Sequence, residues 1–293
     1  IVTGANGMLG STLCRLYHDE HDIHAFHRDE KCYTICSADY SLDLMDVSRL
    51  QVLFSQIKPD LVIHCAGLTS VDACEQEPEL AYKKNVRVCE NIVRACSNKT
   101  KLVYISTDQV YGEARDHSEA NKMLQPLNQY GKTKLLGEQK IQELCNDYLI
   151  LRTNIIGWNI KPGRVSSAEW IYNSLKNKDE ITLFSDYTFS PISTVCLGNI
   201  IMQLVEKKFS GIINVGSSKP CSKFEFGLQL AGEFGLEKSC IRKGLMSDHS
   251  FSALRSNKLD IDVSKLIEMG ITPPDLRHSM RKFVEYYKEQ TVR

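Results

Sequence analysis

The sequence predicts an α/β fold in which a doubly wound parallel sheet is followed by a smaller C-terminal α/β region. In the first half of the chain, short apolar segments alternate with longer amphipathic ones, which is typical of parallel βαβ units. Two of the apolar segments, 61–65 and 102–106, have no polar alternation, as expected of parallel strands that helices cover on both faces.

The periodicity of the apolar residues places the elements in order along the chain. In the first half we expect strands at 1–3, 23–27, 61–65, 102–106 and 148–152, and helices at 8–17, 47–57, 79–97 and 130–145. In the second half we expect helices at 166–176, 195–206, 224–234 and 275–288; the last follows Pro273-Pro274, since proline is favoured at a helix start. The strand expected at 211–215 would return to the main sheet, and the first strand is expected to begin before Ile1. We therefore divide the chain into two closely packed parts, 1–157 and 158–293.

The composition excludes several classes of protein. The 293 residues carry no formal net charge and 42% of them are hydrophobic, so we expect no binding to nucleic acid or to an anionic membrane. No apolar stretch is long enough to span a membrane, and no signal peptide is visible. The 11 cysteines are scattered and lack the paired spacing of a zinc site, so we expect no metal, reduced thiols and a cytoplasmic protein.

A glycine-rich loop follows the first strand and opens the first helix, with the sequence Thr3-Gly4-Ala5-Asn6-Gly7-Met8-Leu9-Gly10. Gly4 would form the tight turn, Gly7 would let a pyrophosphate approach the backbone, and Gly10 would let the helix lie close to the sheet. The start of the helix adds amide donors and a partial positive charge. Although a purely structural turn is the alternative, the loop predicts a Rossmann-like domain at 1–157 that binds NAD(P) through Gly4, Asn6, Gly7, Met8 and Leu9.

The end of the second strand, Phe26-His27-Arg28-Asp29, bears on the choice of cofactor. An acidic side chain there accepts hydrogen bonds from the ribose hydroxyls of NAD, whereas a basic one accommodates the 2′-phosphate of NADP. Arg28 suits the phosphate, and Asp29 stands one position late for the acidic role. We expect NADP(H) rather than NAD(H); the alternative is an exposed Arg–Asp pair without a cofactor role.

The segment Tyr130-Gly131-Lys132-Thr133-Lys134 places a tyrosine and a lysine four residues apart, on one face of a predicted helix. The ammonium of Lys134 would lower the pKa of Tyr130 by favouring the phenolate, which would make the tyrosine a usable acid or base near neutral pH. Thr107 ends the preceding strand, at the sheet edge where α/β proteins bind ligands, and its hydroxyl would orient a substrate carbonyl. We therefore predict Thr107, Tyr130 and Lys134 as catalytic residues.

With these residues and the Gly-x-x-Gly-x-x-Gly loop, the chain resembles the extended short-chain dehydrogenases. Further motifs resemble the dTDP-4-dehydrorhamnose reductases of that superfamily: Thr69-Ser70-Val71-Asp72-Ala73-Cys74-Glu75, Ser106-Thr107-Asp108-Gln109-Val110-Tyr111, Leu151-Arg152-Thr153 and Arg255-Ser256-Asn257-Lys258-Leu259-Asp260. This resemblance covers nearly the whole chain. It implies that residues 158–293 mainly bind substrate, that hydride from NAD(P)H reduces the C4 keto group of a nucleotide-linked 6-deoxy sugar, and that Tyr130 delivers the proton.

The resemblance also implies contacts beyond the glycine loop. Cofactor contacts are expected at Arg28, Asp43, Leu44, Cys65, Ala66, Gly67, Asn85, Tyr130 and Lys134. Substrate contacts are expected at Thr69, Val71, Thr107, Asp108, Asn154 and Arg255. Three departures from the family's pattern put the sugar pocket in question: Ile155 where a tryptophan is usual, with Trp158 three residues later; the segment Asp186-Tyr187-Thr188-Phe189-Ser190-Pro191-Ile192; and Ser256 where a proline is usual.

Two other functions stay open. A sugar-nucleotide epimerase or dehydratase would hold NAD tightly; dehydratases of this superfamily carry a glutamate where this chain has Gln109, whose amide exchanges no proton near neutral pH. A non-catalytic regulatory subunit, similar to the β subunit of methionine adenosyltransferase, would act as a binding partner instead. A homodimer is also considered, and the identities of the sugar and the nucleotide are left open.

Overall fold

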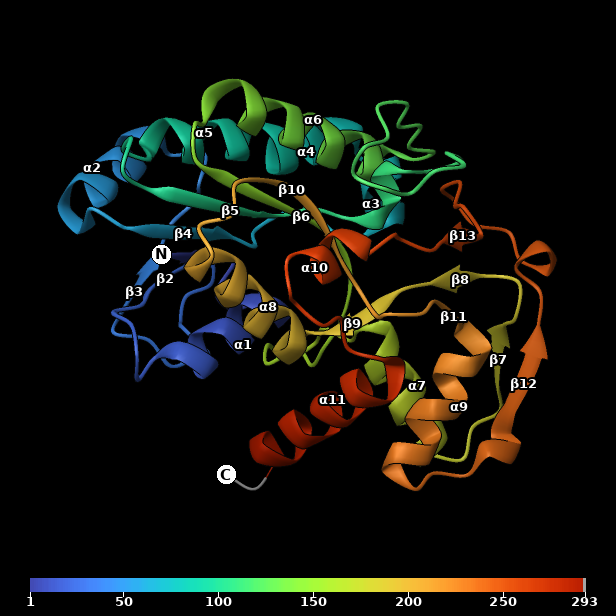
Figure 1. The fold of residues 1–293 in the computed structure, drawn as a ribbon. Coiled ribbons are helices and arrows are strands. Elements are labelled where there is room, and N and C mark those ends of the chain that lie inside the picture. The colour runs from blue at the N-terminus through green and yellow to red at the C-terminus, as the bar shows by residue number, and fades with distance from the viewer. Residues whose placement is uncertain (292–293) are drawn as a thin grey trace.

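The computed structural model describes residues 1–291 and confirms the predicted α/β fold, with a large parallel sheet at its centre (Figure 1). Its strands follow the order β10-β6-β5-β4-β1-β2-β3, and β9 pairs with β6 beside that path. All of these pairs are parallel. The strands are β1 (Val2–Thr3), β2 (His24–His27), β3 (Ala38–Ser41), β4 (Leu61–His64), β5 (Lys101–Ile105), β6 (Tyr148–Ile156), β9 (Pro191–Ser193) and β10 (Gly211–Val215).

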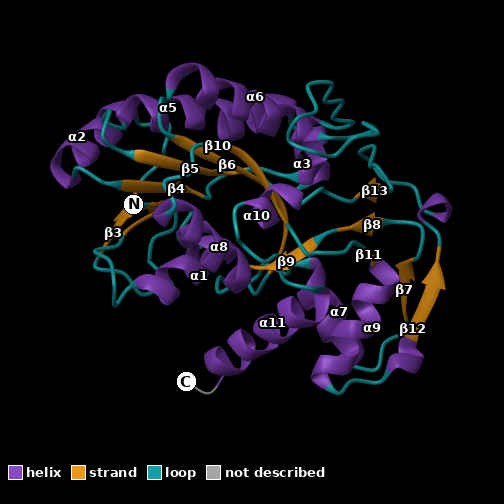
Figure 2. Cartoon of the chain, viewed as in Figure 1, coloured by secondary structure: helices purple, strands orange, loops and turns teal. Residues whose placement is uncertain are grey.

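Helices cover both faces of this sheet (Figure 2). They are α1 (Met8–Tyr17), α2 (Val47–Ile57), α4 (Pro78–Tyr82), α5 (Val88–Ala95), α6 (Gln129–Leu144) and α8 (Thr194–Glu206). Along β5, Leu102 and Tyr104 share a core with α2, α5 and α6, whereas Val103 and Ile105 share one with α1 and α8. Successive residues of a strand point to opposite faces, so a strand covered on both sides has to be apolar throughout.

One predicted helix, 79–97, is interrupted in the structure. Between α4 and α5 lies a π-helical turn, Lys83–Arg87. Its wider backbone turns Asn85 inward, where Oδ1 accepts a hydrogen bond from Leu68 N (2.8 Å) and Nδ2 donates to Leu68 O (3.1 Å) and to Thr133 Oγ1 (3.1 Å). Such turns occur often at functional sites, and here the turn links the loop after β4 to α6.

The second half of the chain forms a smaller α/β lobe with its own core. It contains a three-stranded sheet, β11-β8-β13, and a two-stranded one, β12-β7. Its elements are α7 (Ser167–Lys176), β7 (Ile181–Phe184), β8 (Thr188–Phe189), β11 (Cys221–Ser222), α9 (Lys223–Phe234), β12 (Ile241–Gly244), β13 (Lys258–Leu259) and α11 (Leu276–Thr291). Trp158 is buried in this core, where it stacks on Phe283 with 4.6 Å between ring centroids and donates from Nε1 to Phe283 O. This tryptophan therefore has a packing role and does not replace the one expected near a sugar.

The strands that sequence periodicity missed are short, and several are polar. β3 reads Ala-Asp-Tyr-Ser, and β8, β11 and β13 have two residues each. β6 continues beyond its predicted end because Asn154–Ile156 pairs with β9, a partner from the second half. β10, also from the second half, lies beside β6 in the main sheet. The division into 1–157 and 158–293 stays a prediction.

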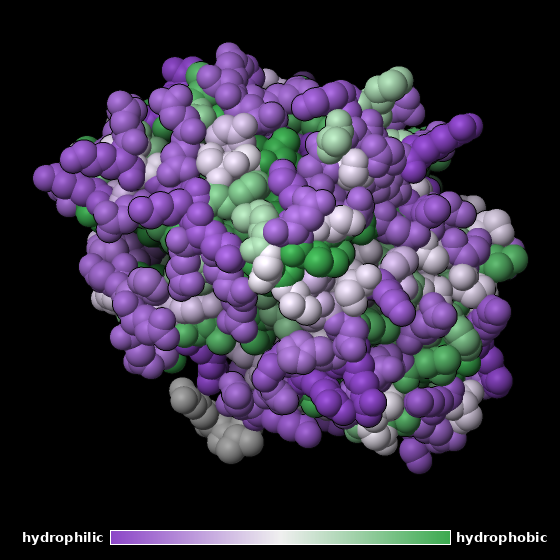
Figure 3. All heavy atoms as spheres, in the orientation of Figure 1, coloured by the Kyte–Doolittle hydropathy of each residue, from purple (hydrophilic) through white to green (hydrophobic). Residues whose placement is uncertain are grey.

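The molecular face in Figure 3 is mostly hydrophilic, with apolar side chains in small groups. Within residues 1–291, the structure has no helix that is both long and apolar enough to cross a membrane. All 11 cysteines carry free thiols.

Candidate active site

The glycine loop joins β1 to α1 at the carboxyl edge of the main sheet. Gly4 has a φ of +65°, and a Cβ there would lie 2.9 Å from Ala66 Cα; a Cβ on Gly10 would lie 2.4 Å from Gly4 O. Both positions therefore require glycine. Gly7 is the N-cap of α1 and provides no side-chain cap, so the first amides of that helix are available to an anion such as a pyrophosphate.

The side chain of Asn6 links the glycine loop to the loop that follows β2 by hydrogen bonds. Its Nδ2 donates to Asp29 Oδ2 (3.0 Å) and to Lys31 O (2.9 Å), and its Oδ1 accepts from Tyr33 N (2.8 Å). Asp29 also forms an ion pair with Lys161. Burial alone would raise the pKa of Asp29, but the hydrogen bonds from Lys161 and Asn6 lower it below its ordinary value. Asn6, predicted as a cofactor contact, thus has a clear structural role.

The side chains predicted to meet the adenosine end of a cofactor lie around this loop. Arg28 is exposed, and its charge helps to lower the pKa of Asp43. Asp43 is itself exposed and pairs with Lys84 Nζ at 3.2 Å, while Leu44 is buried in the core beneath it. Asp29 and Asp43, the two carboxylates predicted at this end of the site, therefore both have lysine partners.

The segment after β4 passes close to the glycine loop. Thr3 Oγ1 forms a hydrogen bond with His64 Nδ1 (2.6 Å) and accepts one from Ala66 N (3.3 Å). Gly67 is exposed, and a Cβ on it would meet Asn85 Oδ1 at 3.0 Å. The predicted contacts Cys65, Ala66, Gly67 and Asn85 thus meet at one edge of the sheet. Burial raises the pKa of the Cys65 thiol, which keeps it protonated.

Tyr130 and Thr107 meet where β5 ends and α6 begins. Asn128 caps α6 by accepting from Gly131 N (2.9 Å), which fixes the position of Tyr130 in the first turn. Burial raises the pKa of Tyr130, and a hydrogen bond with Thr107 opposes that rise. Thr107 is buried and also donates to Asp108 Oδ1 at 3.1 Å. Tyr130 is therefore fully protonated at neutral pH.

Lys134 is placed differently from the expectation. Its buried ammonium donates to Ile105 O at 2.7 Å and lies 3.9 Å from the centre of the Tyr104 ring. Burial lowers the pKa of Lys134 to about 8. The expected lowering of the Tyr130 pKa by Lys134 is wrong for this arrangement, since the ammonium is directed at β5 and burial dominates at the tyrosine.

The predicted substrate contacts separate into an inner and an outer group. Inside, Asn154 donates to Asp108 Oδ2 at 2.5 Å, and burial raises the pKa of Asp108 to about 6 against the effect of that hydrogen bond. Outside, Thr69 is exposed and Val71 begins the short helix α3 (Val71–Gln76). Arg255 donates to Asp72 Oδ2 at 2.7 Å and thereby ties the segment before β13 to α3.

Two residues near Asp108 were missed by sequence reasoning. Lys223, the first residue of α9, holds its ammonium 3.6 Å from the centre of the Phe189 ring, and its charge acts on Asp108. Burial lowers the pKa of Lys223 to about 8. Among residues 1–291, no carboxylate oxygen lies within 4.0 Å of the Lys223 ammonium. The charge of Asp108 nevertheless opposes the lowering of the Lys223 pKa. Tyr187 is also buried, which raises its pKa; the charge of Asp108 adds to this rise, and the charge of Arg255 opposes it.

A buried ion pair lies directly behind the site. Arg152 contacts Glu138 through Nη2–Oε2 (2.7 Å) and Nε–Oε1 (3.1 Å), and neither side chain is more than 3% exposed. Ser106 donates to Glu138 Oε1 at 2.5 Å, and Arg152 Nη1 donates to Tyr111 Oη at 3.2 Å. These contacts connect β5, α6 and β6, which are the elements that carry Thr107, Tyr130 and Asn154.

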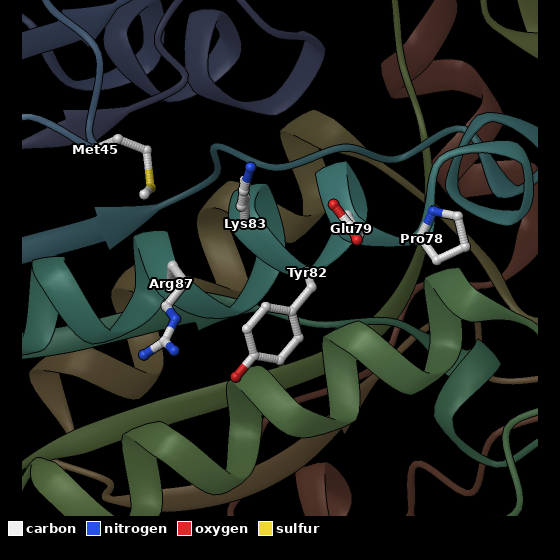
Figure 4. Close-up of a pocket in the computed structure, with 6 residues that line it drawn as sticks. All are labelled: Met45, Pro78, Glu79, Tyr82, Lys83 and Arg87. Atoms are coloured by element: carbon white, nitrogen blue, oxygen red, sulfur yellow. The ribbon is translucent and has the colours of Figure 1, made fainter.

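A hollow of the surface lies away from these residues. Figure 4 shows it on the outer side of α4 and the π turn, lined by Met45, Pro78, Glu79, Tyr82, Lys83 and Arg87. It contains none of the predicted catalytic side chains, so it is a separate feature of the molecule.

Comparisons with known proteins indicate the family of this chain. Residues 1–289 match the family model described as RmlD substrate binding domain. The chain is 28% identical to a dTDP-4-dehydrorhamnose reductase of Bacillus anthracis, solved in complex with NADP, with a TM-score of 0.83 over 97% of this chain and 98% of that one. It is 28% identical to a probable low-salt glycan biosynthesis reductase of Haloferax volcanii, with 95% of each chain covered. It is also 26% identical to the methionine adenosyltransferase 2 subunit beta of Xenopus laevis, over 92% of this chain and 82% of that one.

Proposed function

The chain belongs to the RmlD substrate binding domain family, and on this premise we propose that it is an NADPH-dependent reductase of a nucleotide-linked 4-keto-6-deoxy sugar. The observation that carries the proposal is that Thr107 and Tyr130 meet at the carboxyl end of β5, on the same edge of the parallel sheet as the amides of α1 that no side chain caps. Two hydroxyls at the edge of the sheet that also carries the glycine loop suit proton transfer to a carbonyl oxygen.

A nicotinamide dinucleotide fits the residues of the site. Gly4 and Gly10 have no room for a Cβ, and the start of α1 offers its amides to the pyrophosphate. The side chain of Asp29 is already bonded to Asn6 and Lys161, so it is a poor acceptor for the ribose hydroxyls of NAD. Exposed Arg28 is free to face a 2′-phosphate, which favours NADP(H) as the cofactor. The NADP complex of the related Bacillus anthracis enzyme agrees with this choice.

In the proposed reaction the bound cofactor supplies a hydride to the C4 carbon of the sugar. Tyr130, kept protonated by burial, gives its proton to the C4 oxygen as negative charge develops there. The Thr107 hydroxyl holds that oxygen in line. Lys134 holds the carbonyl of Ile105 at the end of β5, and with a pKa of about 8 it remains mostly protonated at neutral pH.

Asp108 and Lys223 are proposed to bind the sugar together. They are electrostatically coupled but lie further apart than a direct ion pair; Asp108 follows the end of β5, and Lys223 begins α9. A sugar hydroxyl placed between them can donate to the carboxylate and accept from the ammonium. Asn154 orients the carboxylate by its hydrogen bond of 2.5 Å.

The two other functions are less well supported. Gln109 is an amide that receives a hydrogen bond from Asn128 at 3.3 Å, so it offers no acid or base for a dehydratase. Similarity to a methionine adenosyltransferase β subunit leaves room for a partner role, but Thr107, Tyr130 and Lys134 are all retained here. A homodimer and a cytoplasmic location stay predictions.

The proposal is tested by offering the purified protein a panel of nucleotide-linked 4-keto sugars with NADPH or NADH and following the loss of reduced nicotinamide. Tyr130→Phe is expected to lower kcat at least about 100-fold, since general acid catalysis is typically worth about 10²–10⁴. Its affinity for NADPH should stay close to that of the parent. Tyr82→Phe, on the outer side of α4, is the matched control and should turn over normally.

Three outcomes would count against the reductase. A Tyr130→Phe rate near that of the parent would remove the tyrosine from the mechanism. Copurified NAD that is regenerated in each turnover would indicate an epimerase. Tight association with a second enzyme, with no turnover of any keto sugar, would indicate a regulatory subunit.

A further inference from the structure

Side chains that bind metals converge beside the loop that joins β2 to β3. His27 from β2, Cys32 from the loop and Asp39 from β3 hold their ligand atoms within 4.8 Å of one another. Cys36 Sγ lies 3.9 Å from Cys32 Sγ, but it is not among the ligand atoms that all lie within 4.8 Å of one another. The cluster lies on the face of the sheet covered by α1, and none of the four residues belongs to the proposed catalytic set.

The sheet itself holds two of these ligands in place. β2 and β3 are parallel, with Ala25 opposite Asp39 and His27 opposite Ser41. Residues opposite each other in a parallel pair point to the same face, so His27 and Asp39 are diagonal neighbours on one face. His27 is almost fully buried, with a side chain that is 1% exposed. Its position therefore follows from the backbone and not from a chance approach of flexible side chains.

Both ring nitrogens of His27 face hydrogen-bond acceptors, which favours a positive charge at this residue. Its Nδ1 lies 3.1 Å from the carbonyl oxygen of Asp29, and its Nε2 lies 2.9 Å from Asp39 Oδ2. Both neighbours are acceptors, whereas a neutral imidazole has a single N–H. If that hydrogen is donated to Asp29, a positive charge is needed at Nε2, and either a second ring proton or a bound cation supplies it. Metal-bound histidines usually donate their other N–H to a carbonyl or carboxylate in this way.

The separation of the thiols agrees with one particular ion. Zinc–sulfur bonds of about 2.3 Å at a tetrahedral angle place two sulfurs about 3.8 Å apart. The two Sγ atoms here are 3.9 Å apart. Two sulfurs, one imidazole and one carboxylate form a donor set that suits Zn²⁺, whereas hard cations such as Mg²⁺ prefer oxygen alone. We propose that His27, Cys32, Cys36 and Asp39 form a structural zinc site.

Such a site would stiffen the loop against which the glycine loop rests. In the same loop, Lys31 O accepts a hydrogen bond from the Asn6 side chain and Tyr33 N donates one to it. An ion at Cys32 would therefore be bound between these two hydrogen-bonded residues. Three ligands already converge, and in the proposed site Cys36 turns in as the fourth; four protein ligands would complete the coordination, as in a structural and not a catalytic site. The sequence alone indicated no metal because the cysteine spacing lacks a second pair. The missing ligands come from β2 and β3, whose register brings them together.

The test uses the full chain and measures zinc, so its outcome does not depend on the proposed reductase. The reduced protein is stripped with a chelator, dialysed and titrated with Zn²⁺ against a chromophoric chelator, and bound zinc is counted by elemental mass spectrometry. We expect one zinc per chain. Cys32→Ser and Asp39→Asn should each weaken zinc binding by at least about tenfold, the lower end of what is typical even for lost outer-shell partners. Asp39→Asn is the milder variant, because that side chain is 48% exposed.

Cys240→Ser is the matched control, since Cys240 lies in the second lobe with its Sγ near Lys178 O. It should bind zinc like the parent. Cobalt substitution provides a second readout, in which a thiolate-to-cobalt absorption band should appear in the parent and fade in Cys32→Ser. No uptake of zinc by the reduced chain, or uptake that Cys32→Ser leaves unchanged, overturns the proposal. A Cys32–Cys36 disulfide in the untreated protein, with no zinc bound after reduction, also overturns it and indicates a redox pair.

Discussion

Lys223→Met is the variant that most directly tests how the proposed sugar pocket works. The substitution removes the ammonium but keeps an unbranched side chain of similar length, so the contact with the Phe189 ring is preserved. In the proposed complex the ammonium donates to a sugar hydroxyl that Asp108 also binds. Replacing either Asp108 or Lys223 should therefore remove the contribution of both residues to substrate binding.

The expected size of the effect follows from the chemistry of that contact. A hydrogen bond to a charged group typically contributes about 1.5–3 kcal/mol. At about 1.4 kcal/mol per tenfold change, its loss corresponds to a decrease in kcat/KM of roughly 10- to 150-fold. The decrease should fall mainly on KM, because the contact forms in the bound substrate as well as in the transition state. The affinity for NADPH should not change, since Lys223 lies at the start of α9 and not at the glycine loop.

The assay is steady-state reduction of the best 4-keto sugar nucleotide from the panel, with NADPH binding measured separately. Lys219→Met is the matched control, because Lys219 is exposed in the segment just before β11. Asp108→Asn and the double variant complete a mutant cycle, which should show a coupling of about 0.5–3 kcal/mol if both groups bind one hydroxyl. A kcat/KM for Lys223→Met within about twofold of the parent, or additive effects in the cycle, would refute the proposed pairing.

Three further predictions concern the loop, the buried ion pair and pH. Gly10→Ala should abolish NADPH binding measured by fluorescence, since the added Cβ would lie 2.4 Å from a loop carbonyl, whereas Gly232→Ala, which meets only a flexible lysine, should bind normally. Glu138→Gln should lower the free energy of unfolding in denaturant by about 3–5 kcal/mol, because it leaves the guanidinium of Arg152 buried without its partner charge; a loss under about 1 kcal/mol would contradict this. Burial lowers the pKa of Lys223 from 10.5 to about 8. The charged ammonium therefore lowers the free energy of unfolding most below pH 8, and this destabilisation disappears as the pH rises to 10.5. Lys223→Met should therefore unfold at a higher temperature than the parent at pH 7, with a gap that narrows between pH 8 and 10.5.

The regular part of the fold could be predicted because its helices carry a clear apolar period. The helices 8–17 and 47–57 have the predicted bounds, and each buries one face on the sheet. The family could also be predicted, since the motifs span nearly the whole chain, and the match over residues 1–289 confirms it. Thr107 could be placed because a residue at the end of a parallel strand lies at the ligand-binding edge of the sheet.

The rest depends on contacts that no local pattern encodes. The charge of Lys223 acts on Asp108 from the second lobe, where the strands have two to four residues and show no usable period. The π turn at Asn85 depends on hydrogen bonds to Leu68 and Thr133, which are distant in sequence. The direction of the Lys134 ammonium is set by the carbonyl of Ile105 and not by the helical spacing that pairs it with a tyrosine.

The neighbouring hydroxyls of Ser106 and Thr107 explain why the site needs a charged core behind it. They are adjacent where β5 ends, so they point in opposite directions: Ser106 donates to Glu138 Oε1, and Thr107 lies where it lowers the pKa of Tyr130. The ion pair of Glu138 and Arg152 therefore fixes the strand end from one side, while the other side carries Thr107, the residue proposed to meet the substrate. An apolar core would stabilise the fold equally well, but it would not hold the Ser106 hydroxyl and with it the direction of Thr107. A Ser106→Ala variant should then fold normally yet lower kcat more than it raises KM, because only the placement of the reacting hydroxyls is loosened.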